Sequence, residues 1–273
     1  MAIETIILLL ILAFIAELID SSLGMMYGTL LSPLLIIMGF EPLVVIPSLL
    51  FSQALGGTLA AIFHNRYANA NFRPKTANLK TINKKIRELG IAESFKRGFG
   101  KDFKIAFIVT ILGVLATFFA SLVAINIPKS LLKGYIGVLV LVMGVIVLSR
   151  FSFNFTWKKM LGIGILSSFN KGLSGGGFGP VVTCGQVISG NDPKSSIAVT
   201  TLSEVPICLT GFLTFSLVNG FSNWSFVAFL TLGAMLAAPL GPLLTSRLNE
   251  KKIKPILGVL AIALGLWILY SLL

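Results

Sequence analysis

The second half of this chain repeats the first half at a constant offset of 151 residues, which is the offset of Gly175 from Gly24. The run Gly24-Met25-Met26-Tyr27-Gly28 aligns with Gly175-Gly176-Gly177-Phe178-Gly179. The same register places Asp20 on Lys171 and Ser52-Gln53 on Ser203-Glu204. Duplicated halves that each hold a glycine-broken apolar segment beside a charge are typical of secondary transporters, whose sites lie where broken helices meet at mid-membrane.

The composition places these halves in a membrane. Hydrophobic residues make up 55% of the chain and charged residues only 12%, whereas about 25% of residues are charged in ordinary globular domains. The mean hydropathy is +0.93. Several apolar runs approach the ~20 residues that cross a bilayer core. We therefore expect an all-α, multi-pass integral protein of the cell membrane.

Each half contains five apolar segments. The tails of the halves match at a smaller offset, 121 residues, because Gly137-Val138-Leu139 aligns with Gly258-Val259-Leu260. The difference is an insertion at 66–102 in the first half. We expect an N-terminal membrane repeat at 1–150 and a C-terminal repeat at 151–273. The segments are 3–19, 22–39, 43–63, 103–125 and 131–149, then 160–170, 173–189, 195–218, 225–246 and 254–273.

The basic residues predict the orientation. The net charge is +12, and half of the 22 Lys and Arg residues lie in or beside the insertion. Short cytoplasmic loops accumulate Lys and Arg, so this pattern favours a cytoplasmic 66–102 loop over a nucleic-acid site. Counting spans from that loop places both termini outside. It also requires inverted repeats, because parallel repeats would put the basic 247–254 loop on the wrong side. The eleven basic residues in or beside the insertion are Arg66, Arg73, Lys75, Lys80, Lys84, Lys85, Arg87, Lys96, Arg97, Lys101 and Lys104.

The first two segments of each half are unusual. Segment 160–170 is too short to span a membrane at 1.5 Å per residue, and 173–189 opens with Ser174-Gly175-Gly176-Gly177, which disfavours a continuous helix. We expect helices that are broken or re-entrant near the midplane, where protein encloses the irregular backbone. Whether 22–39 and 173–189 span the membrane or re-enter stays open from the sequence. Residues 78–99 of the insertion have the spacing of an amphipathic surface helix.

Four ionisable residues lie within apolar segments: Glu17, Asp20, Lys171 and Glu204. Charged side chains in a membrane cost several kcal/mol and generally mark function. If the halves are inverted, Asp20 and Lys171 approach each other near the pseudo-two-fold axis. One interpretation is an ion pair that only locks the halves together. The other is that Lys171 attracts an anion while Asp20, Glu17 or Glu204 carries a proton or orients its neighbours.

Backbone and neutral polar groups complete the candidate site. A glycine run before a helix can point N–H groups at an anion, which makes Gly175, Gly176, Gly177 and Gly179 candidate binding residues beside Lys171. Close helix packing through small residues is the alternative. Ser52 and Gln53 in one half, and Thr200 and Ser203 in the other, form polar stripes that either line the cavity or only bond the helices together.

Other chemistry finds little support. His64, the single histidine, ends segment 43–63 and is expected at the membrane interface. Cys184 and Cys208 lie in apolar segments and predict no disulfide framework. No nucleophile–base pair or Cys/His cluster is visible, so we expect no catalytic residues, no metal, no cofactor and no enzymatic activity.

Two stretches resemble a known family. Ser32-Pro33-Leu34-Leu35 with Gly39-Phe40-Glu41-Pro42, and Leu173 to Thr183 followed by Thr200-Thr201-Leu202, resemble the repeat signatures of the TauE/SafE family, also called the domain of unknown function 81 group. The resemblance covers nearly the whole chain except the 66–102 insertion. It implies an anion permease for sulfite or organosulfur anions such as sulfonates.

The sequence thus favours a secondary transporter of a small anion, with proton coupling as an option. The rival hypothesis is a membrane-embedded enzyme or a non-transporting assembly component. The expected partners are the anion and the lipid bilayer, and no nucleic acid. The oligomeric state stays open, with a dimer as one option.

Overall fold

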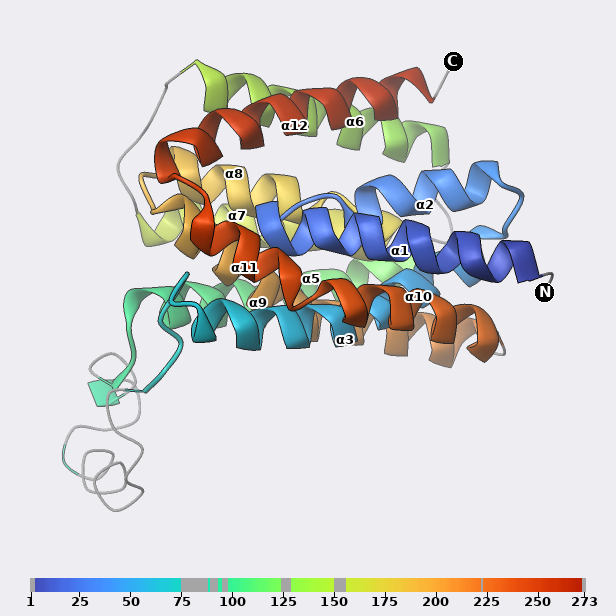
Figure 1. Cartoon of the computed structure of the whole chain (residues 1–273), viewed down its shortest axis with the longest axis horizontal. Helices are drawn as coiled ribbons and strands as arrows, with labels where there is room; N and C mark the ends of the chain where they lie inside the picture. Colours follow the sequence, from blue (N-terminus) through green and yellow to red (C-terminus); the bar gives the residue numbers. More distant parts are fainter. Residues whose placement is uncertain are drawn as a thin grey trace.

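A computed structural model describes residues 3–74, 88, 93–94, 98–123, 129–149, 156–221 and 223–271. Within these ranges every regular element is an α-helix (Figure 1). The helices are α1 (Ile3–Leu23), α2 (Tyr27–Ile37), α3 (Pro42–Arg66), α5 (Lys101–Val123), α6 (Lys129–Leu148), α7 (Trp157–Ser174), α8 (Phe178–Ile188), α9 (Pro193–Asn219), α10 (Trp224–Ala237), α11 (Leu240–Arg247) and α12 (Glu250–Tyr270).

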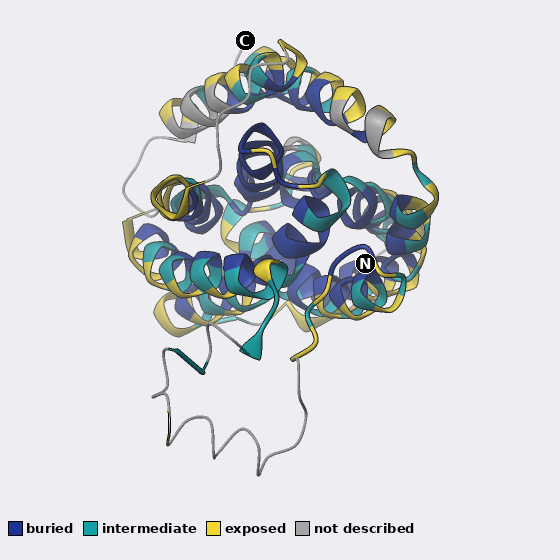
Figure 2. Ribbon diagram, turned by 90° about the vertical axis from the view of Figure 1, so that its left-hand side faces the viewer, coloured by how far each residue is buried: buried dark blue, intermediate teal, exposed yellow. Residues whose placement is uncertain are grey.

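Length and apolarity identify the helices that can cross a bilayer. Among the described residues five stretches qualify: α1, α3, α5, α9 and the combined range Trp224–Arg247. Large apolar side chains such as Leu217 and Leu236 are exposed, whereas the interior holds polar residues such as Lys171. Figure 2, seen along the bundle, shows the buried residues facing inwards and the exposed ones at the perimeter. The expected all-α membrane fold is confirmed.

The helix bounds follow the two offsets found in the sequence. At offset 151, α2 and α8 correspond over their full lengths, and α3 and α9 begin at corresponding residues. At offset 121, α6 and α12 begin at corresponding residues. The inverted relation of the halves and the domain boundary at 150 stay predictions.

Contacts between the halves are reciprocal. Helix α3 packs against α9, and α6 packs against α12. Helix α5 packs on α7 and α9, while α10, which occupies the corresponding place in the second half, packs on α1 and α3. Each half therefore packs against helices of the other half, and both halves contribute helices to the centre of the molecule.

The two ends of the bundle differ. In Figure 1 the start of α1 and the end of α12 lie at one end, whereas α3 ends and α5 begins at the opposite end. The junction between α11 and α12 and the start of α7 lie at that second end too. The described basic residues in these junctions are Arg66, Arg73, Lys101, Lys158, Lys159, Arg247 and Lys252.

Three expectations need adjustment. The segment expected at 160–170 is longer, because α7 runs without a break through Lys171 to Ser174. The segment expected at 225–246 is two helices, since Pro239 lacks an N–H and stands between α10 and α11. The amphipathic helix predicted for 78–99 lies mostly outside the described residues.

Candidate functional site

Both halves break their first helix in the same way. Helix α7 is followed by Gly175, which has a φ of 73°, and α1 is followed by Gly24, which has a φ of 72°. This left-handed conformation is readily adopted only by glycine. Two residues later Gly177 has a φ of 77° and Met26 has a φ of 131°. The first half therefore keeps the break although a methionine, for which positive φ is strained, replaces the second glycine.

The helices after these breaks, α2 and α8, have 11 residues each. At 1.5 Å per residue they reach only about half of the bilayer core. In Figure 1 α2 extends towards the end of the bundle with the termini, and α8 towards the opposite end. This confirms that the helices are interrupted, and it makes 22–39 and 173–189 half-length segments.

The two breaks contact each other. The Gly177 N–H donates to Thr29 Oγ1 at 3.0 Å, and Thr183 Oγ1 donates to the Gly24 carbonyl at 2.9 Å. A Cβ on Gly179 would lie 2.9 Å from the Met25 Cα, and one on Gly176 would lie 3.0 Å from the Thr29 Cα. These glycines therefore support the packing interpretation, because they let two backbones touch.

The four ionisable residues are all buried, with exposed fractions of 1% for Glu17 and Lys171 and 5% for Asp20 and Glu204. Lys171 on α7 forms an ion pair with Glu204 on α9, with 2.7 Å between Nζ and Oε1. Its ammonium also donates to Gln53 Oε1 on α3. The Gln53 amide nitrogen donates in turn to Asp20 Oδ2 on α1 at 3.2 Å.

The expected Asp20–Lys171 pair is therefore indirect. The two residues do come together, but Gln53 stands between them, and the carboxylate bound to Lys171 is that of Glu204. The pairs Asp20–Gln53 and Lys171–Glu204 occupy corresponding positions of the two halves. Lys171 crosses from one pair to the other, so one side chain joins both halves. We call Asp20, Gln53, Lys171 and Glu204 the polar centre.

Two acids have additional surroundings. Asp20 Oδ1 accepts the Tyr27 N–H at 3.0 Å, so Asp20 caps the first turn of α2. Glu17 lies one turn before Asp20 on α1 and faces α3, where a Cβ on Gly56 would lie 3.2 Å from its carboxyl carbon. Its Oε2 atom is buried and has no hydrogen-bond partner within the part of the chain that the structure describes.

The remaining candidate residues, Ser52, Thr200 and Ser203, form hydrogen bonds with other protein groups. Ser52 Oγ bonds the Tyr27 hydroxyl at 2.7 Å. The hydroxyl oxygens of Thr183 and Thr200 lie 2.9 Å apart, a contact that joins α8 to α9. Ser203 donates to the carbonyl of Val199 within its own helix. Thr200 and Ser203 thus bond protein groups rather than Lys171.

Sequence reasoning missed several neutral polar residues. Asn170 is fully buried, and among the described residues neither its amide oxygen nor its amide nitrogen has a hydrogen-bond partner. Gln186 is fully buried as well, and its Oε1 accepts no hydrogen bond from the residues that the structure describes. Tyr27, Asn170 and Gln186 carry no charge at neutral pH, so the cost of a buried charge does not mark them in an apolar segment as it marks Lys171. For Asn170 the sequence does offer a signal, because this polar residue directly precedes Lys171 within an apolar segment.

His64 is buried rather than exposed at an interface. Its Nε2 lies 2.9 Å from the Ser21 carbonyl oxygen, so that nitrogen carries the proton. Its Nδ1 lies 3.0 Å from the Asn69 amide nitrogen, and Asn69 also donates to the Pro242 carbonyl at 2.8 Å. His64 therefore ties α3 to α1 and, through Asn69, to α11.

These observations define a class: a multi-pass helical membrane protein whose broken helices meet beside a buried, charged centre. The sulfite exporter TauE/SafE family model matches residues 89–268, which is well over half of the chain. The protein belongs to the sulfite exporter TauE/SafE family, and the resemblance seen in the sequence is confirmed.

A curated relative is also similar to this chain. It is described as "Probable membrane transporter protein YtnM" of Bacillus subtilis (strain 168), and it is 24% identical over 267 residues. The match covers 92% of this chain and 79% of the relative. No solved structure gives a significant match. Family and relative together support a membrane transporter.

Proposed function

We propose that the protein is a secondary transporter of a small anion, with sulfite or an organosulfur anion such as a sulfonate as the substrate. The observation that carries this proposal is Lys171. Its ammonium is buried, and it contacts Gln53 from one half and Glu204 from the other. An anion that enters between the halves would meet this charge at a point where residues of both halves contact it.

The charges of the centre support proton coupling. Lys171 is accompanied by three carboxyl groups, those of Glu17, Asp20 and Glu204. If all three were ionised, Lys171 and these carboxylates together would carry a net charge of −2, and an incoming anion would be repelled. Protons on the carboxyls would remove this repulsion. Binding of an anion should therefore accompany uptake of protons by these groups.

The exchange of partners suggests how the anion would bind. A buried ammonium stays charged only when it is paired, and here Glu204 provides the pairing carboxylate. A substrate oxyanion could replace that carboxylate at Lys171 while Glu204 carries a proton. The second amide hydrogen of Gln53, which is not given to Asp20, offers a further N–H donor near the charge.

Alternating access would use the broken helices. The breaks before α2 and α8 contact each other, and hydrogen bonds such as that of Gly177 with Thr29 join the two halves there. We propose that inverted halves rock about this contact. The end with the basic junctions is assigned to the cytoplasm, and both termini to the outside, by the positive-inside rule.

A flux assay tests the proposal. Purified protein is reconstituted into proteoliposomes, and uptake of radiolabelled sulfite and of simple sulfonates is measured with and without an imposed proton gradient. Lys171→Met should abolish flux. Lys158→Met is the matched control, because Lys158 is an exposed lysine on the same helix, and it should leave flux unchanged.

The result would also discriminate between the alternatives. If Lys171→Met folds and transports like the unaltered protein, the ion pair is only a clamp between the halves. If the unaltered protein moves none of these anions in either direction, a membrane-embedded enzyme or a non-transporting component becomes the better hypothesis.

A further inference from the structure

The carboxyl group of Glu17 differs from those of the polar centre in its hydrogen bonds. Each carboxyl oxygen of Asp20 accepts an N–H group, and Glu204 accepts the Lys171 ammonium at 2.7 Å. Glu17 is buried as well, yet its Oε2 accepts no hydrogen bond from the residues that the structure describes. A carboxylate here would hold a buried charge without a donor on that oxygen, which is costly.

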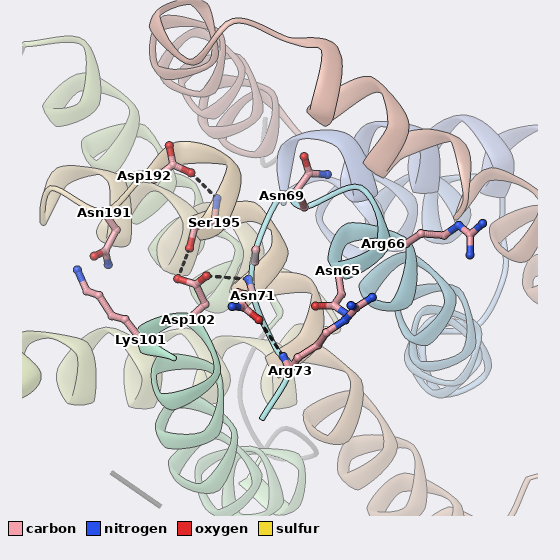
Figure 3. A pocket seen from close by; sticks show the side chains of 12 residues that line it. Asn65, Arg66, Asn69, Asn71, Arg73, Lys101, Asp102, Asn191, Asp192 and Ser195 are labelled. Carbon is pink, nitrogen blue, oxygen red and sulfur yellow. Dashed lines mark hydrogen bonds between the residues drawn. The ribbon is translucent and has the colours of Figure 1, made fainter. Parts of the chain in front are cut away.

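Carboxylates near water show the usual arrangement. A polar pocket lies at the basic end of the bundle, between the end of α3, the start of α5 and the turn from α8 to α9 (Figure 3). There Asp102 accepts the Asn71 N–H at 2.9 Å and the Ser195 hydroxyl at 2.7 Å. Asp192 accepts the Ser195 N–H at 2.8 Å. Glu17 Oε2 lacks such a donor although it lies in the interior, which favours a neutral carboxyl group there.

Small residues make room for the Glu17 carboxyl between α1, α3 and α10. A Cβ on Gly56 of α3 would lie 3.2 Å from the Glu17 carboxyl carbon and 3.1 Å from the Cβ of Ala234 on α10. The carboxyl group therefore occupies space that a larger side chain at position 56 would fill. We call Glu17, Gly56 and Ala234 the acid niche.

The second half fills the corresponding space without an acid. The offset of 151 places Glu17 on Ser168 and Gly56 on Ile207, and the offset of 121 relates Gly113 to Ala234. A Cβ on Gly113 would meet both the Ile207 side chain and Ser168 Oγ, so the same three positions meet in both halves. The second half combines a hydroxyl with an isoleucine, whereas the first half combines a carboxyl with a glycine. The acid niche is thus a feature of the first half alone.

The surrounding charges do not favour another carboxylate. The charged groups that act on Glu17 are the carboxylates of Asp20 and Glu204 and the ammonium of Lys171, which is already paired with Glu204. Helix α10 has no ionisable side chain. The other ionisable side chains on helices packed against α1 are Tyr27 on α2, His64 and Arg66 on α3, Lys194 and Cys208 on α9, and Arg247 on α11.

We infer that Glu17 carries a proton in the state described by the structure, and that this proton is the one exchanged with the proton gradient. The proton occupancy rests on the acid niche, whereas the coupling role rests on the proposed transport function. With Glu17 neutral, the one ammonium of Lys171 and the two carboxylates of Asp20 and Glu204 give a net charge of −1 instead of −2, so an incoming anion is repelled less.

A proton suits the acid niche better than a metal cation does. Hard cations bind through several oxygen ligands, whereas the niche residues that face Glu17 from α3 and α10 are Gly56 and Ala234, which have no side-chain oxygen. Release of the proton to water would leave a carboxylate beside two others. Glu17 should therefore release it only when the centre opens and water can solvate the new charge.

The first arm of the test measures the proton without transport. Exposed carboxyl groups are ionised at neutral pH, so an infrared C=O band of a protonated carboxyl at that pH reports a buried acid. The band should be present in the purified protein and lost in Glu17→Gln, which keeps the size of the side chain. Glu4→Gln, which alters an exposed acid of the same helix, should retain it.

Chemical labelling gives the same information on the unaltered protein. Dicyclohexylcarbodiimide is an apolar reagent that reacts with protonated carboxyl groups, and the modified residue is identified by mass spectrometry of the digested chain. Modification is expected at Glu17. Modification at Asp20 or Glu204 instead, or an infrared band that persists in Glu17→Gln, would overturn the inference.

The second arm measures coupling in proteoliposomes. Glu17→Gln should lose accumulation of radiolabelled sulfite driven by a proton gradient, yet retain exchange of external labelled sulfite for internal unlabelled sulfite, because exchange needs no release of the proton. Glu4→Gln should retain both activities. Proton-driven accumulation that survives in Glu17→Gln, or accumulation driven by a sodium gradient in the unaltered protein, would overturn the coupling role.

The two arms separate this inference from the transport proposal. If the unaltered protein transports no anion, the transport proposal and the coupling role fail together, while the infrared and labelling results still decide whether Glu17 carries a proton. If transport is measured but the infrared band does not depend on Glu17, the inference alone is overturned.

Discussion

At the scale of single residues, Lys171 determines the charge balance of the buried polar centre. A buried ion pair adds little stability in total, but removing one partner leaves an uncompensated charge in a low-dielectric interior. Here the partner left behind would be the Glu204 carboxylate, which is 5% exposed. A stability measurement can therefore separate the charge balance of the centre from its role in transport.

Lys171→Met should destabilise the folded protein by about 3–5 kcal/mol. The double variant Lys171→Met with Glu204→Gln should recover part of that loss, because the orphaned charge is removed. Unfolding of the purified variants by denaturant in detergent provides the measurement. Equal stabilities of the single and double variants would contradict a charged Glu204 in the pair.

Asp20→Asn should weaken flux and change its dependence on pH. The asparagine oxygen can still accept the Tyr27 N–H and cap α2, so the fold should survive, but the residue can no longer exchange a proton. Flux into proteoliposomes is measured across a pH series. Glu4→Gln, an exposed acid at the start of the same helix, is the control. An unaltered pH profile would exclude Asp20 from coupling.

The sequence identified the residues of the polar centre but not their pairing. A charge within an apolar segment is visible in the sequence, so Glu17, Asp20, Lys171 and Glu204 could be named. The repeat offset shows which positions correspond, not which side chains touch. Long side chains on α7 and α9 reach each other within one half, and this geometry, rather than the pseudo-axis, sets the Lys171–Glu204 pair.

At the scale of elements, the helix breaks before α2 and α8 contact each other and together form one interface between the halves. Helices α2 and α8 are too short to fix their own positions by length, and their starts are held by Asp20, Thr29 and Thr183. Close backbone approach at Gly176 and Gly179 then sets the distance between the halves. Side chains added at these glycines should separate the breaks.

Gly179→Ala should destabilise the protein by about 1–3 kcal/mol through overpacking, because its Cβ would meet the backbone of Gly24 and Met25. Gly162→Ala is the matched control: Gly162 lies on α7 with nothing within 4 Å of an added Cβ, and alanine favours helix. Thermal unfolding in detergent compares them. If the two variants unfold alike, the breaks are looser than their contacts indicate.

Most elements could be predicted, because apolar runs in a membrane protein report helices directly. The exceptions have local causes. Lys171 ended the expected segment 160–170 in the sequence, but its burial beside Glu204 allows α7 to continue to Ser174. Pro239 divides 225–246 in two, and a proline within an apolar run does not reveal whether it kinks or ends a helix.

At the scale of the whole molecule, the bundle has a basic end and a less basic end. The junctions from α3 to α5, before α7 and from α11 to α12 gather at one end (Figure 1), and the sequence predicted that they would share a side. Which side of the membrane this end faces is the remaining element of the predicted topology.

Single introduced cysteines can decide the sidedness. Lys158→Cys and a cysteine near residue 85 should react with a membrane-impermeant maleimide only after the cytoplasmic side is opened. Asn223→Cys, at the start of α10, should react from outside in intact cells. Labelling of residues 158 and 223 from the same side would overturn the topology.

Both native cysteines are fully buried, and one of them borders the polar centre, because the thiol of Cys208 is 4.0 Å from Gln53 Oε1. Cys208 can therefore serve as a native chemical probe of how the polar centre opens. A small thiol reagent can reach Cys208 only during the moments when water reaches Lys171, so the rate of its alkylation measures how often the centre opens. A bound substrate that holds the centre closed should slow that rate, whereas Cys184, packed among apolar side chains beside α12, should be indifferent to it.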